Sequence, residues 1–266
     1  MAMALNSCVE AEIVLISILV LRGITIMKIV EKMTTKRNMQ REKPVTIAFL
    51  GDSVTQGCFE CYMKDANSVT SVYDYKSAFS TRMREILNLL YPNVQINIIN
   101  SGISGDIAEK GLQRMEQDVL AYSPDLCVVS FGLNDSSAGT SKLGEYADNI
   151  YAIVKQLIDN GIETIFLTQN SMNTYVSCHL KDEMLINIAK NKMMDQNSGV
   201  LSQYMIAGMN AAKQAGAVIC DLSSVWNKLL DSGVDTTELL ANKINHPIRE
   251  FHYYMAIKLI ETIFEI

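Results

Sequence analysis

Two side chains in this sequence, those of Ser53 and His246, have the types and surroundings needed for nucleophilic catalysis. Ser53 follows the apolar run 45–50 after a Gly-Asp pair, so we expect it at a sharp turn that ends a buried strand. A turn of this kind puts a serine at the carboxyl edge of a sheet, where open α/β folds bind their ligands. Serine is a weak nucleophile until a base takes its proton. His246, in a loop before a helical pattern, is our candidate for that base.

Two further turns follow predicted strands and contain donors for an oxyanion. The first is 100–106, with sequence NSGISGD, and the second is 132–135, with sequence GLND. Gly105 exposes a backbone N–H without a side chain in the way, and Asn134 can aim an amide N–H at the same point. With the N–H of Ser53 these groups make three oxyanion donors. Either turn alone has ordinary turn composition, so its glycines and amides do not by themselves indicate a site.

The elements that must position these residues alternate between strand and helix patterns. Apolar, β-branched runs predict strands, and apolar residues at helical spacing predict helices. The predicted strands are 45–50, 94–99, 125–131, 164–168 and 217–222; the predicted helices are 75–91, 107–122, 143–160 and 249–264. Alternation of this kind favours right-handed crossovers, so we expect a three-layer α/β/α domain with a parallel sheet of about five strands.

Residues 172–216 are longer than a simple crossover and rich in methionine. Such a segment could form a lid or a wall of the substrate site. A pair of helices that fills ordinary core with methionine accounts for the same composition, and both interpretations stay open.

Four short blocks of the chain resemble, in the same order, those of the SGNH, or GDSL, hydrolase superfamily. They are Gly51-Asp52-Ser53, the turns 100–106 and 132–135, and His246-Pro247. The resemblance covers the chain from about Val45 onward; each block is short, but four in sequence make chance an unlikely source. It implies a flavodoxin-like fold and hydrolysis of carboxylic esters or thioesters. Carried over residue by residue, it makes Ser53 the nucleophile, His246 the general base, and Ser53, Gly105 and Asn134 the oxyanion hole.

The chain departs from the family at the residue that usually orients the histidine. Family members have Asp three residues before the histidine, whereas this chain has Lys243, which cannot accept a hydrogen bond. Three replacements are possible: Asn242 as a neutral acceptor, a backbone carbonyl, or a carboxylate such as Asp235 or Glu238. We favour a Ser-His dyad with a neutral acceptor, and expect the loss of Asp to affect rate more than reaction type.

The remaining cysteines and histidines give weaker signals. Cys58 and Cys61 have the C-x-x-C spacing of a redox or zinc site, and Cys178 with His179 could complete four ligands. No second compact pair announces a structural zinc, so we interpret the two cysteines as ordinary thiols and expect no metal or cofactor. We expect His179 and His252 to be surface or core histidines rather than bases.

Composition limits the partners and the location. The chain has 266 residues and a net charge of −6, which gives no electrostatic case for nucleic acid or anionic membrane surfaces. We expect an N-terminal extension or helix with a linker over 1–43 and the hydrolase domain over 44–266. The apolar stretch 13–21 is preceded by acidic residues, so a secretory signal is not expected. We expect a cytoplasmic protein; in the alternative, a membrane anchor near the N-terminus holds the catalytic domain in the cytoplasm.

These observations predict a serine esterase that forms an acyl-enzyme on Ser53, with His246 as base, and acts on short-acyl or acetyl esters of a carbohydrate or small metabolite. A thioesterase or lysophospholipase of the same superfamily is one alternative. A non-catalytic carbohydrate-binding or scaffold protein on the same fold is another, because fold does not determine function.

Overall fold

A five-stranded parallel sheet lies at the centre of the computed structural model, which describes residues 27–36, 43–65 and 68–265. Its strands are β1 (Val45–Gly51), β4 (Ile96–Gly102), β5 (Leu126–Ser130), β6 (Glu163–Leu167) and β7 (Val218–Cys220). The order across the sheet is β4-β1-β5-β6-β7, and every neighbouring pair runs parallel. The prediction of a parallel sheet with about five strands is therefore confirmed.

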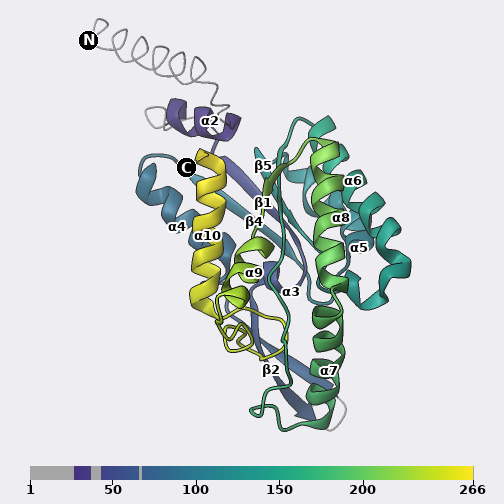
Figure 1. Cartoon of the computed structure of the whole chain (residues 1–266). Helices are drawn as coiled ribbons and strands as arrows, with labels where there is room; N and C mark the ends of the chain where they lie inside the picture. The colour runs from purple at the N-terminus through teal and green to yellow at the C-terminus, as the bar shows by residue number, and fades with distance from the viewer. Residues whose placement is uncertain (1–26, 37–42, 66–67, 266) are drawn as a thin grey trace, which may run out of the picture.

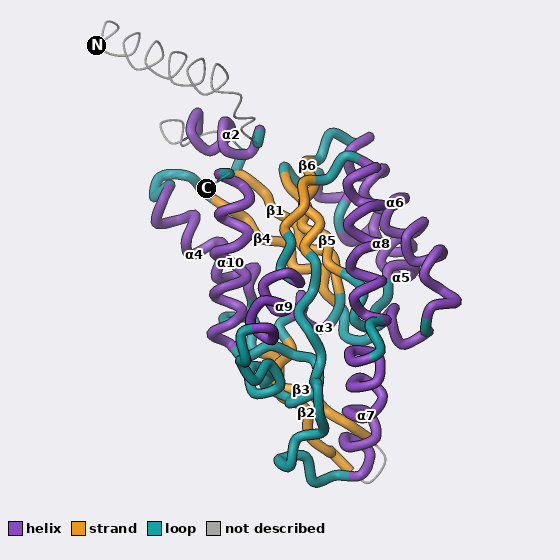
Figure 2. Tube along the Cα trace, in the orientation of Figure 1, coloured by secondary structure: helices purple, strands orange, loops and turns teal. Residues whose placement is uncertain are grey.

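Helices cover both faces of this sheet. Figures 1 and 2 show α4 (Phe79–Leu90) and α10 (Arg249–Phe264) on one side of it, and α5 (Ala108–Asp118), α6 (Leu143–Asp159) and α8 (Val200–Ala215) on the other. A short helix, α9 (Ser223–Asp231), was not predicted; its Trp226 packs on Phe251 of α10 with ring centroids 4.3 Å apart. The three-layer α/β/α architecture is confirmed.

The strands without polar alternation are buried from both sides. Residues 47–50 of β1 have no exposed surface, and Phe166 of β6 is also fully buried. Burial of each such large apolar side chain stabilises the fold by about 1.5–3 kcal/mol, an upper estimate because unfolded chains are partly compact. The sheet therefore holds the carboxyl ends of its strands in a fixed arrangement.

The methionine-rich segment forms α7 (Glu183–Asn197) and α8, joined by a short turn. Helix α8 packs against α6 and contributes Tyr204, Met205 and Ala212 to the main core. Leu185 and Ala189 of helix α7 instead form a smaller cluster with Ile244, from the loop that contains His246. The interpretation as a helical pair that fills core therefore describes α8, whereas α7 lies at the end of the molecule where the hairpin described next projects (Figure 1).

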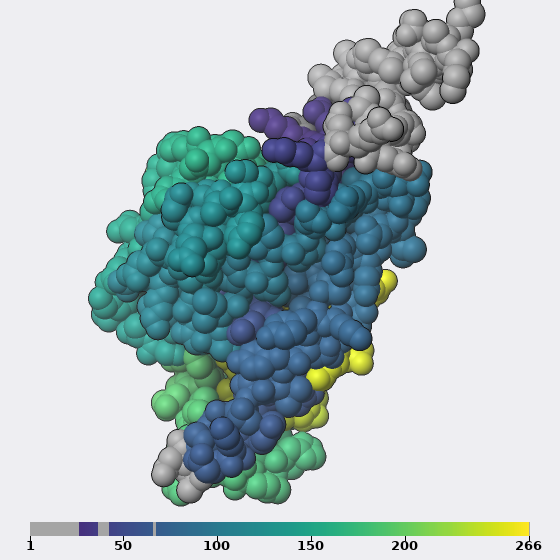
Figure 3. Space-filling model, turned by 180° about the vertical axis from the view of Figure 1, so that it is seen from behind, coloured from purple at the N-terminus to yellow at the C-terminus, as the bar shows by residue number. Residues whose placement is uncertain are grey.

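An antiparallel hairpin that we did not predict follows the serine turn. It consists of β2 (Cys58–Asp65) and β3 (Ser68–Tyr73), which come after α3 (Ser53–Gln56). Figure 3 shows the blue surface of this hairpin projecting at one end of the molecule, beside green residues near α7 and yellow residues of the C-terminal quarter. The hairpin thus lies against the segments that contain the candidate base.

The described part of the predicted N-terminal extension is α2 (Lys28–Lys36), which packs on the domain. The carboxylate of Glu163 accepts hydrogen bonds from the backbone N–H groups of Lys28 and Ile29, at 2.8 Å each. The apolar stretch 13–21 lies outside the described residues. Within the part of the chain that the structure describes, no helix is long and apolar enough to cross a membrane.

The described residues also form three short 3₁₀ helices: η1 (Leu120–Tyr122), η2 (Asp135–Ala138) and η3 (Thr140–Lys142).

Candidate active site

Ser53 is the first residue of α3, directly beyond the carboxyl end of β1. The side chain of Asp52 caps this helix, because its Oδ1 accepts a hydrogen bond from Val54 N at 3.0 Å. The backbone N–H of Ser53 is among the first N–H groups of the helix, which have no partner within it. Gly102 at the end of β4 makes the turn possible, since a Cβ there would lie 2.2 Å from the backbone nitrogen of Gln56.

The buried Asp52 carboxylate is held from the other side by a residue that we did not predict. Gln169, after β6, donates from Nε2 to Asp52 Oδ2 at 2.8 Å and accepts from Leu133 N at 2.6 Å. Burial raises the pKa of Asp52, while the hydrogen bonds from Gln169 and Val54 oppose that shift. Gln169 therefore joins the serine turn to the turn after β5. In the sequence, the feature that could have identified Gln169 as a site residue is its position directly after the predicted strand 164–168, at the carboxyl edge of the sheet.

His246 meets Ser53 across the site. Its Nε2 lies 3.0 Å from Ser53 Oγ, and both residues are nearly buried, with 6% and 5% of their surface exposed. Its Nδ1 lies 3.0 Å from the carbonyl oxygen of Phe59. A carbonyl can only accept, so the proton of a neutral ring sits on Nδ1 and the lone pair of Nε2 faces the serine hydroxyl. This is the tautomer that a general base requires.

The loop that holds His246 is shaped by Asn242. Its Oδ1 accepts hydrogen bonds from the backbone N–H groups of Ile244, Asn245 and His246, at 3.0, 2.9 and 3.0 Å. The loop is closed by a hydrogen bond from Ala241 N to the carbonyl of His246 at 2.7 Å. Asn242 therefore fixes the backbone of His246. Its side-chain NH2 group donates to residues other than His246.

Asp235 and Glu238, the two carboxylates proposed for the missing Asp, have other partners. Asp235 accepts from the hydroxyl of Tyr175 at 2.7 Å and from Thr237 N at 3.1 Å. Glu238 pairs with Lys243 at 2.9 Å. Of the replacements left open by the sequence, the backbone carbonyl is the one that lies against Nδ1, in the form of the Phe59 carbonyl of the hairpin at 3.0 Å.

Arg249, at the start of α10, contacts the side chains of Phe59 and Glu60, the two residues joined by the peptide group of that carbonyl. The guanidinium lies 4.4 Å from the centroid of the buried Phe59 ring. It donates to both carboxylate oxygens of Glu60, at 2.5 and 3.0 Å, and to Asp74 at 3.0 Å. The hydrogen bonds from Arg249 lower the pKa of Glu60, while burial opposes that shift. The first residues of β2 are thus tied to the helix that follows His246.

The two predicted oxyanion turns are joined to each other. Asn134 donates from Nδ2 to the carbonyl of Asp106 at 2.9 Å, and Asp135 accepts from Ala108 N at 2.8 Å. An amide has two N–H donors, so the Asn134 side chain keeps a second one after this bond. Gly105 has a φ of +80°, a conformation that favours glycine. The turns that carry Gly105 and Asn134 are therefore held together at the edge of the sheet beside Ser53.

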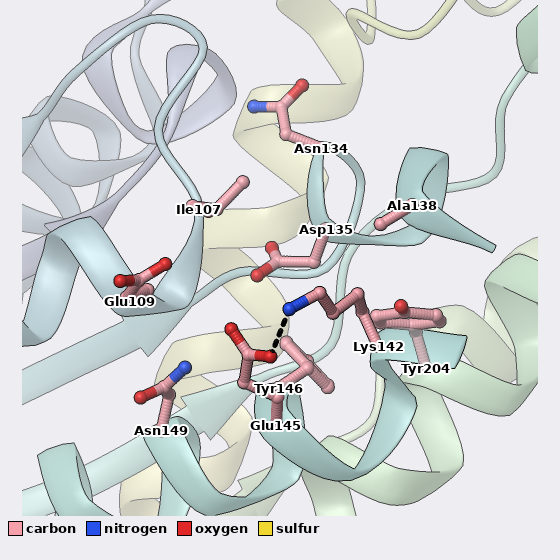
Figure 4. A pocket seen from close by; sticks show the side chains of 10 residues that line it. All are labelled: Ile107, Glu109, Asn134, Asp135, Ala138, Lys142, Glu145, Tyr146, Asn149 and Tyr204. Carbon is pink, nitrogen blue, oxygen red and sulfur yellow. Dashed lines mark hydrogen bonds and ion pairs between the residues drawn. The ribbon is translucent and has the colours of Figure 1, made fainter. Parts of the chain in front are cut away.

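A pocket of about 190 Å3 lies beside this turn (Figure 4). Neither Ser53 nor His246 lines it, and the Asn134 side chain points away from the residues at its centre. Burial raises the pKa of Asp135, one of its walls, to about 6. This pocket is therefore separate from the Ser53–His246 pair.

Cys58 and Cys61 lie near the base. Cys61 Sγ is 3.9 Å from Nδ1 of His246 and 3.5 Å from Ser71 Oγ. The pKa of Cys61 is lowered, first by the hydrogen bond with Cys58 and also by His246, while burial opposes the shift. The pKa of Cys58 is raised by the same hydrogen bond and by burial. Among the described residues, Cys178 and His179 do not join this group, so the four-ligand set considered from the sequence is not assembled.

The other two histidines lie away from Ser53. His179 is exposed in the loop before α7. His252 is fully buried in α10, where Nδ1 accepts a hydrogen bond from Phe79 N at 3.2 Å. Burial lowers the pKa of His252 to about 3, and electrostatic interactions with His246 and Arg249 add to this shift.

Comparison with known proteins gives one family match and several similar structures. The profile of the GDSL-like Lipase/Acylhydrolase family matches residues 49–252. An acetylxylan esterase of Geobacillus stearothermophilus is 23% identical over 192 residues, which are 69% of this chain and 78% of that protein.

The similar structures are esterases that share the fold. Axe2, an acetylxylan esterase from Geobacillus stearothermophilus, has a TM-score of 0.60 at 19% identity, covering 85% of this chain and 96% of that one. The acetyl xylan esterase AlAXEase has a TM-score of 0.61 at 19% identity, covering 82% and 100%. CEX, a two-domain esterase active on acetylated mannans, has a TM-score of 0.60 at 16% identity, covering 88% and 52%.

Proposed function

The chain belongs to the GDSL-like Lipase/Acylhydrolase family and is a carboxylic ester hydrolase, and on that premise we propose that it removes short acyl groups, above all acetyl, from a carbohydrate or small metabolite. Ser53 is the nucleophile and His246 the base. The observation that carries this proposal is the 3.0 Å contact between Nε2 of His246 and Oγ of Ser53, in the tautomer that leaves the lone pair of Nε2 toward the hydroxyl.

The reaction proceeds through an acyl-enzyme. Oγ of Ser53 attacks the ester carbonyl while its proton moves to Nε2 of His246, and the imidazolium then gives that proton to the departing alcohol. A water molecule then attacks the acyl carbon while giving a proton to Nε2 of His246. The acyl–Oγ bond breaks, Nε2 returns that proton to Oγ of Ser53, and the carboxylic acid is released. The backbone N–H groups of Ser53 and Gly105 and the free N–H of Asn134 stabilise the negative oxygen of each tetrahedral intermediate.

The imidazolium in this site relies on a neutral partner. The carbonyl of Phe59 orients the ring as an Asp would, but contributes a dipole in place of a full charge. The chain therefore keeps the reaction type of its family while giving up part of the stabilisation of the imidazolium.

Two observations support a short acyl group on a sugar. Ser53 is only 5% exposed, and the pocket beside Asn134 is not lined by it, so the described residues offer a long acyl chain no channel through that pocket. Tyr73 and Tyr75 stack at 6.2 Å and are exposed, and the Tyr73 hydroxyl donates to Ser104 beside Gly105 at 3.1 Å. Exposed aromatic rings offer flat apolar area with a polar edge, which suits a sugar ring. The similar proteins named above include esterases of acetylated xylan and mannan.

The test is covalent labelling by a fluorophosphonate, followed by intact mass. The wild-type protein should gain one adduct, Ser53→Ala should gain none, and Ser232→Ala, at an exposed serine after α9, should label as the wild type does. Absence of an adduct on the wild type would favour a non-catalytic binding protein.

Substrate class is tested separately with paired esters. Acetylated xylo-oligosaccharides and p-nitrophenyl acetate should be hydrolysed at least about tenfold faster, as kcat/KM, than p-nitrophenyl decanoate or a long-chain acyl thioester, which corresponds to about 1.4 kcal/mol of transition-state discrimination. A preference for the long chain would point to a lysophospholipase or thioesterase.

The basic residues after the apolar N-terminal stretch still favour a cytoplasmic location in our proposal. Fractionation of cells that express the full chain, with an antibody against the hydrolase domain, tests it.

A further inference from the structure

The strongest unassigned feature of the described residues is a group of three metal-ligating atoms behind the base. The Sγ atoms of Cys58 and Cys61 and a ring nitrogen of His246 all lie within 4.8 Å of one another, and Cys61 Sγ is 3.9 Å from Nδ1. We propose that these three atoms bind a thiophilic divalent cation such as Zn2+, and that the bound cation switches off His246 as a base. The second half of this proposal rests on the catalytic role proposed for His246.

A bulge in the hairpin brings the two thiols together. Residues three apart on a regular strand face opposite sides of the sheet. Here Cys58 pairs with Tyr73 and Cys61 with Ser71. Between these two pairs β2 advances by three residues and β3 by two, so the register shifts. The additional residue allows both side chains to lie on the His246 side. The cysteine spacing alone does not predict this convergence.

The spacing of the three atoms is close to that of a tetrahedral zinc site. Zinc lies about 2.3 Å from a thiolate and about 2.0–2.1 Å from an imidazole nitrogen, so ligand atoms of one site are about 3.5–3.8 Å apart. Cys61 Sγ and Nδ1 are 3.9 Å apart, and one ligand atom from each of the three residues lies within 4.8 Å of the other two. Side-chain adjustments of less than about 1 Å would complete the site. Two thiolates and one imidazole leave a fourth position for water.

Binding of a cation reverses the tautomer of His246. Without metal, Nδ1 donates to the carbonyl of Phe59 and the lone pair of Nε2 faces Ser53. A cation takes the lone pair of Nδ1, so a neutral ring must carry its proton on Nε2. Nε2 is then a donor and cannot accept the proton of Ser53. The two thiols release their protons to solvent as the cation binds.

The imidazole of His246 therefore cannot act as a base toward Ser53 through Nε2 while Nδ1 is a metal ligand. A cation bound there inhibits hydrolysis without occupying the substrate site. The donor atoms that would bind the cation are two sulfurs and one nitrogen. Such soft donors select Zn2+ over Mg2+ or Ca2+, which prefer oxygen.

The binding experiment uses the Ser53→Ala protein, which retains all three ligands. The protein is held under reducing conditions throughout. Titration with Zn2+ against a chromophoric chelator should give one tight site per chain. Cobalt(II) should give the near-ultraviolet thiolate charge-transfer band and the visible bands of tetrahedral coordination. Adding Cys58→Ser and Cys61→Ser should weaken binding at least about a hundredfold and abolish the thiolate band, since neutral hydroxyls replace both thiolates. Adding Cys178→Ser, at an exposed thiol outside the group, should change neither. Binding that survives the loss of both thiols would overturn the site.

The activity experiment compares the hydrolysis rate of each protein with Zn2+ and without it. At free Zn2+ ten times the measured Kd, hydrolysis of p-nitrophenyl acetate by the wild type should fall about elevenfold by mass action and recover on chelation. The rate of Cys58→Ser/Cys61→Ser should be the same with and without Zn2+. Tight binding through the thiols without inhibition of an active enzyme would overturn the tautomer switch.

The two proposals fail in different ways. A protein that binds Zn2+ through both thiols but shows neither labelling nor hydrolysis would overturn the esterase mechanism and leave the metal site in place. An active enzyme that gains no thiolate band with cobalt would overturn the metal site and leave the mechanism in place.

Discussion

The carbonyl oxygen of Phe59 lies 3.0 Å from Nδ1 of His246, where it accepts a hydrogen bond from the protonated ring nitrogen. The chain segment that turns at Ser53 thus continues into the strand that orients the base for that serine. Because the acceptor belongs to the backbone of β2, its position depends on the hairpin and on Arg249, which holds the hairpin to α10. The orientation of the base is therefore a property of packing.

The first prediction concerns the Ser53–His246 pair as a unit. Ser53→Ala and His246→Ala should each lower kcat for p-nitrophenyl acetate by about 10³-fold or more, because each removes the same proton transfer. The double variant should be hardly slower than either single one. Steady-state kinetics on the four proteins measures the coupling, with His179→Ala as a matched control at an exposed histidine. Losses that multiply in the double variant would mean that the two residues act independently.

The second prediction concerns the residues considered as replacements for the family Asp. Lys243→Asp, Asp235→Asn and Glu238→Gln should each leave kcat within about threefold, because Nδ1 already has an acceptor in Phe59 and these side chains bond elsewhere. Initial rates at saturating substrate, with circular dichroism to confirm folding, check this. A loss of orders of magnitude in one folded variant would identify that side chain as the orienting group.

The sequence predicts the central sheet and its helices better than it predicts the active site. The strands and most helices follow from long apolar runs between turn residues, because a doubly covered parallel sheet needs strands without polar alternation. The hairpin β2–β3 gave no such signal: most of its residues are at least partly exposed, and Ala-Asn, the dipeptide between its strands, is a weak hairpin-turn sequence.

The missed hairpin accounts for the missed chemistry. A backbone acceptor such as the carbonyl of Phe59 has no side-chain signature, so sequence could leave it open as an alternative but could not locate it. The approach of Cys58 and Cys61 to His246 depends on a bulge and on a contact between distant segments. Neither is encoded in local periodicity.

The third prediction concerns Asn134 as an oxyanion donor. Asn134→Ala should lower kcat by about 10²–10³-fold with little change in KM, because the lost N–H acts on charge that develops only in the transition state. Asn134→Ala also removes the bond to the carbonyl of Asp106, so the melting temperature is measured beside the kinetics. Asp135→Asn, at the next residue, is the control for disturbance of the turn. An effect confined to KM would assign Asn134 to substrate binding.

The fourth prediction concerns Arg249 as a positioning residue for the Phe59 carbonyl. Arg249→Ala should lower kcat about tenfold with KM little changed, because the hairpin start loses its bonds to α10 while the substrate site is left in place. Arg249→Lys should recover only part of the rate, since lysine cannot bind Glu60 through two fixed donors. Arg82→Ala, at a nearby arginine paired with Glu85, is the control. An Arg249→Ala enzyme with full kcat would show that the carbonyl holds its place without this network.

The last prediction concerns stability and follows from the buried His252. Its folded pKa of about 3 lies below the ordinary value of 6.5, chiefly because burial disfavours the charged ring. Above about pH 6.5 both the folded and unfolded chains hold this ring neutral. As the pH falls below that value the unfolded chain takes up a proton that the folded chain does not, so the free energy of unfolding decreases by up to about 1.4 kcal/mol per pH unit until the folded pKa is reached.

A substitution at His252 separates this contribution from those of other groups. Asn at this position can still accept the hydrogen bond from Phe79 N, but it does not titrate. The variant should be less stable than the wild type at pH 7.5, because its smaller side chain leaves space beside Phe59. That stability difference should shrink by about 2 kcal/mol between pH 7.5 and pH 5, since only the wild type loses the contribution of the neutral ring. Urea unfolding at both pH values measures it, and His179→Asn, at the exposed histidine, should show no such change. A difference between wild type and His252→Asn that stays constant with pH would mean that His252 accepts its proton as readily in the folded chain as in the unfolded one.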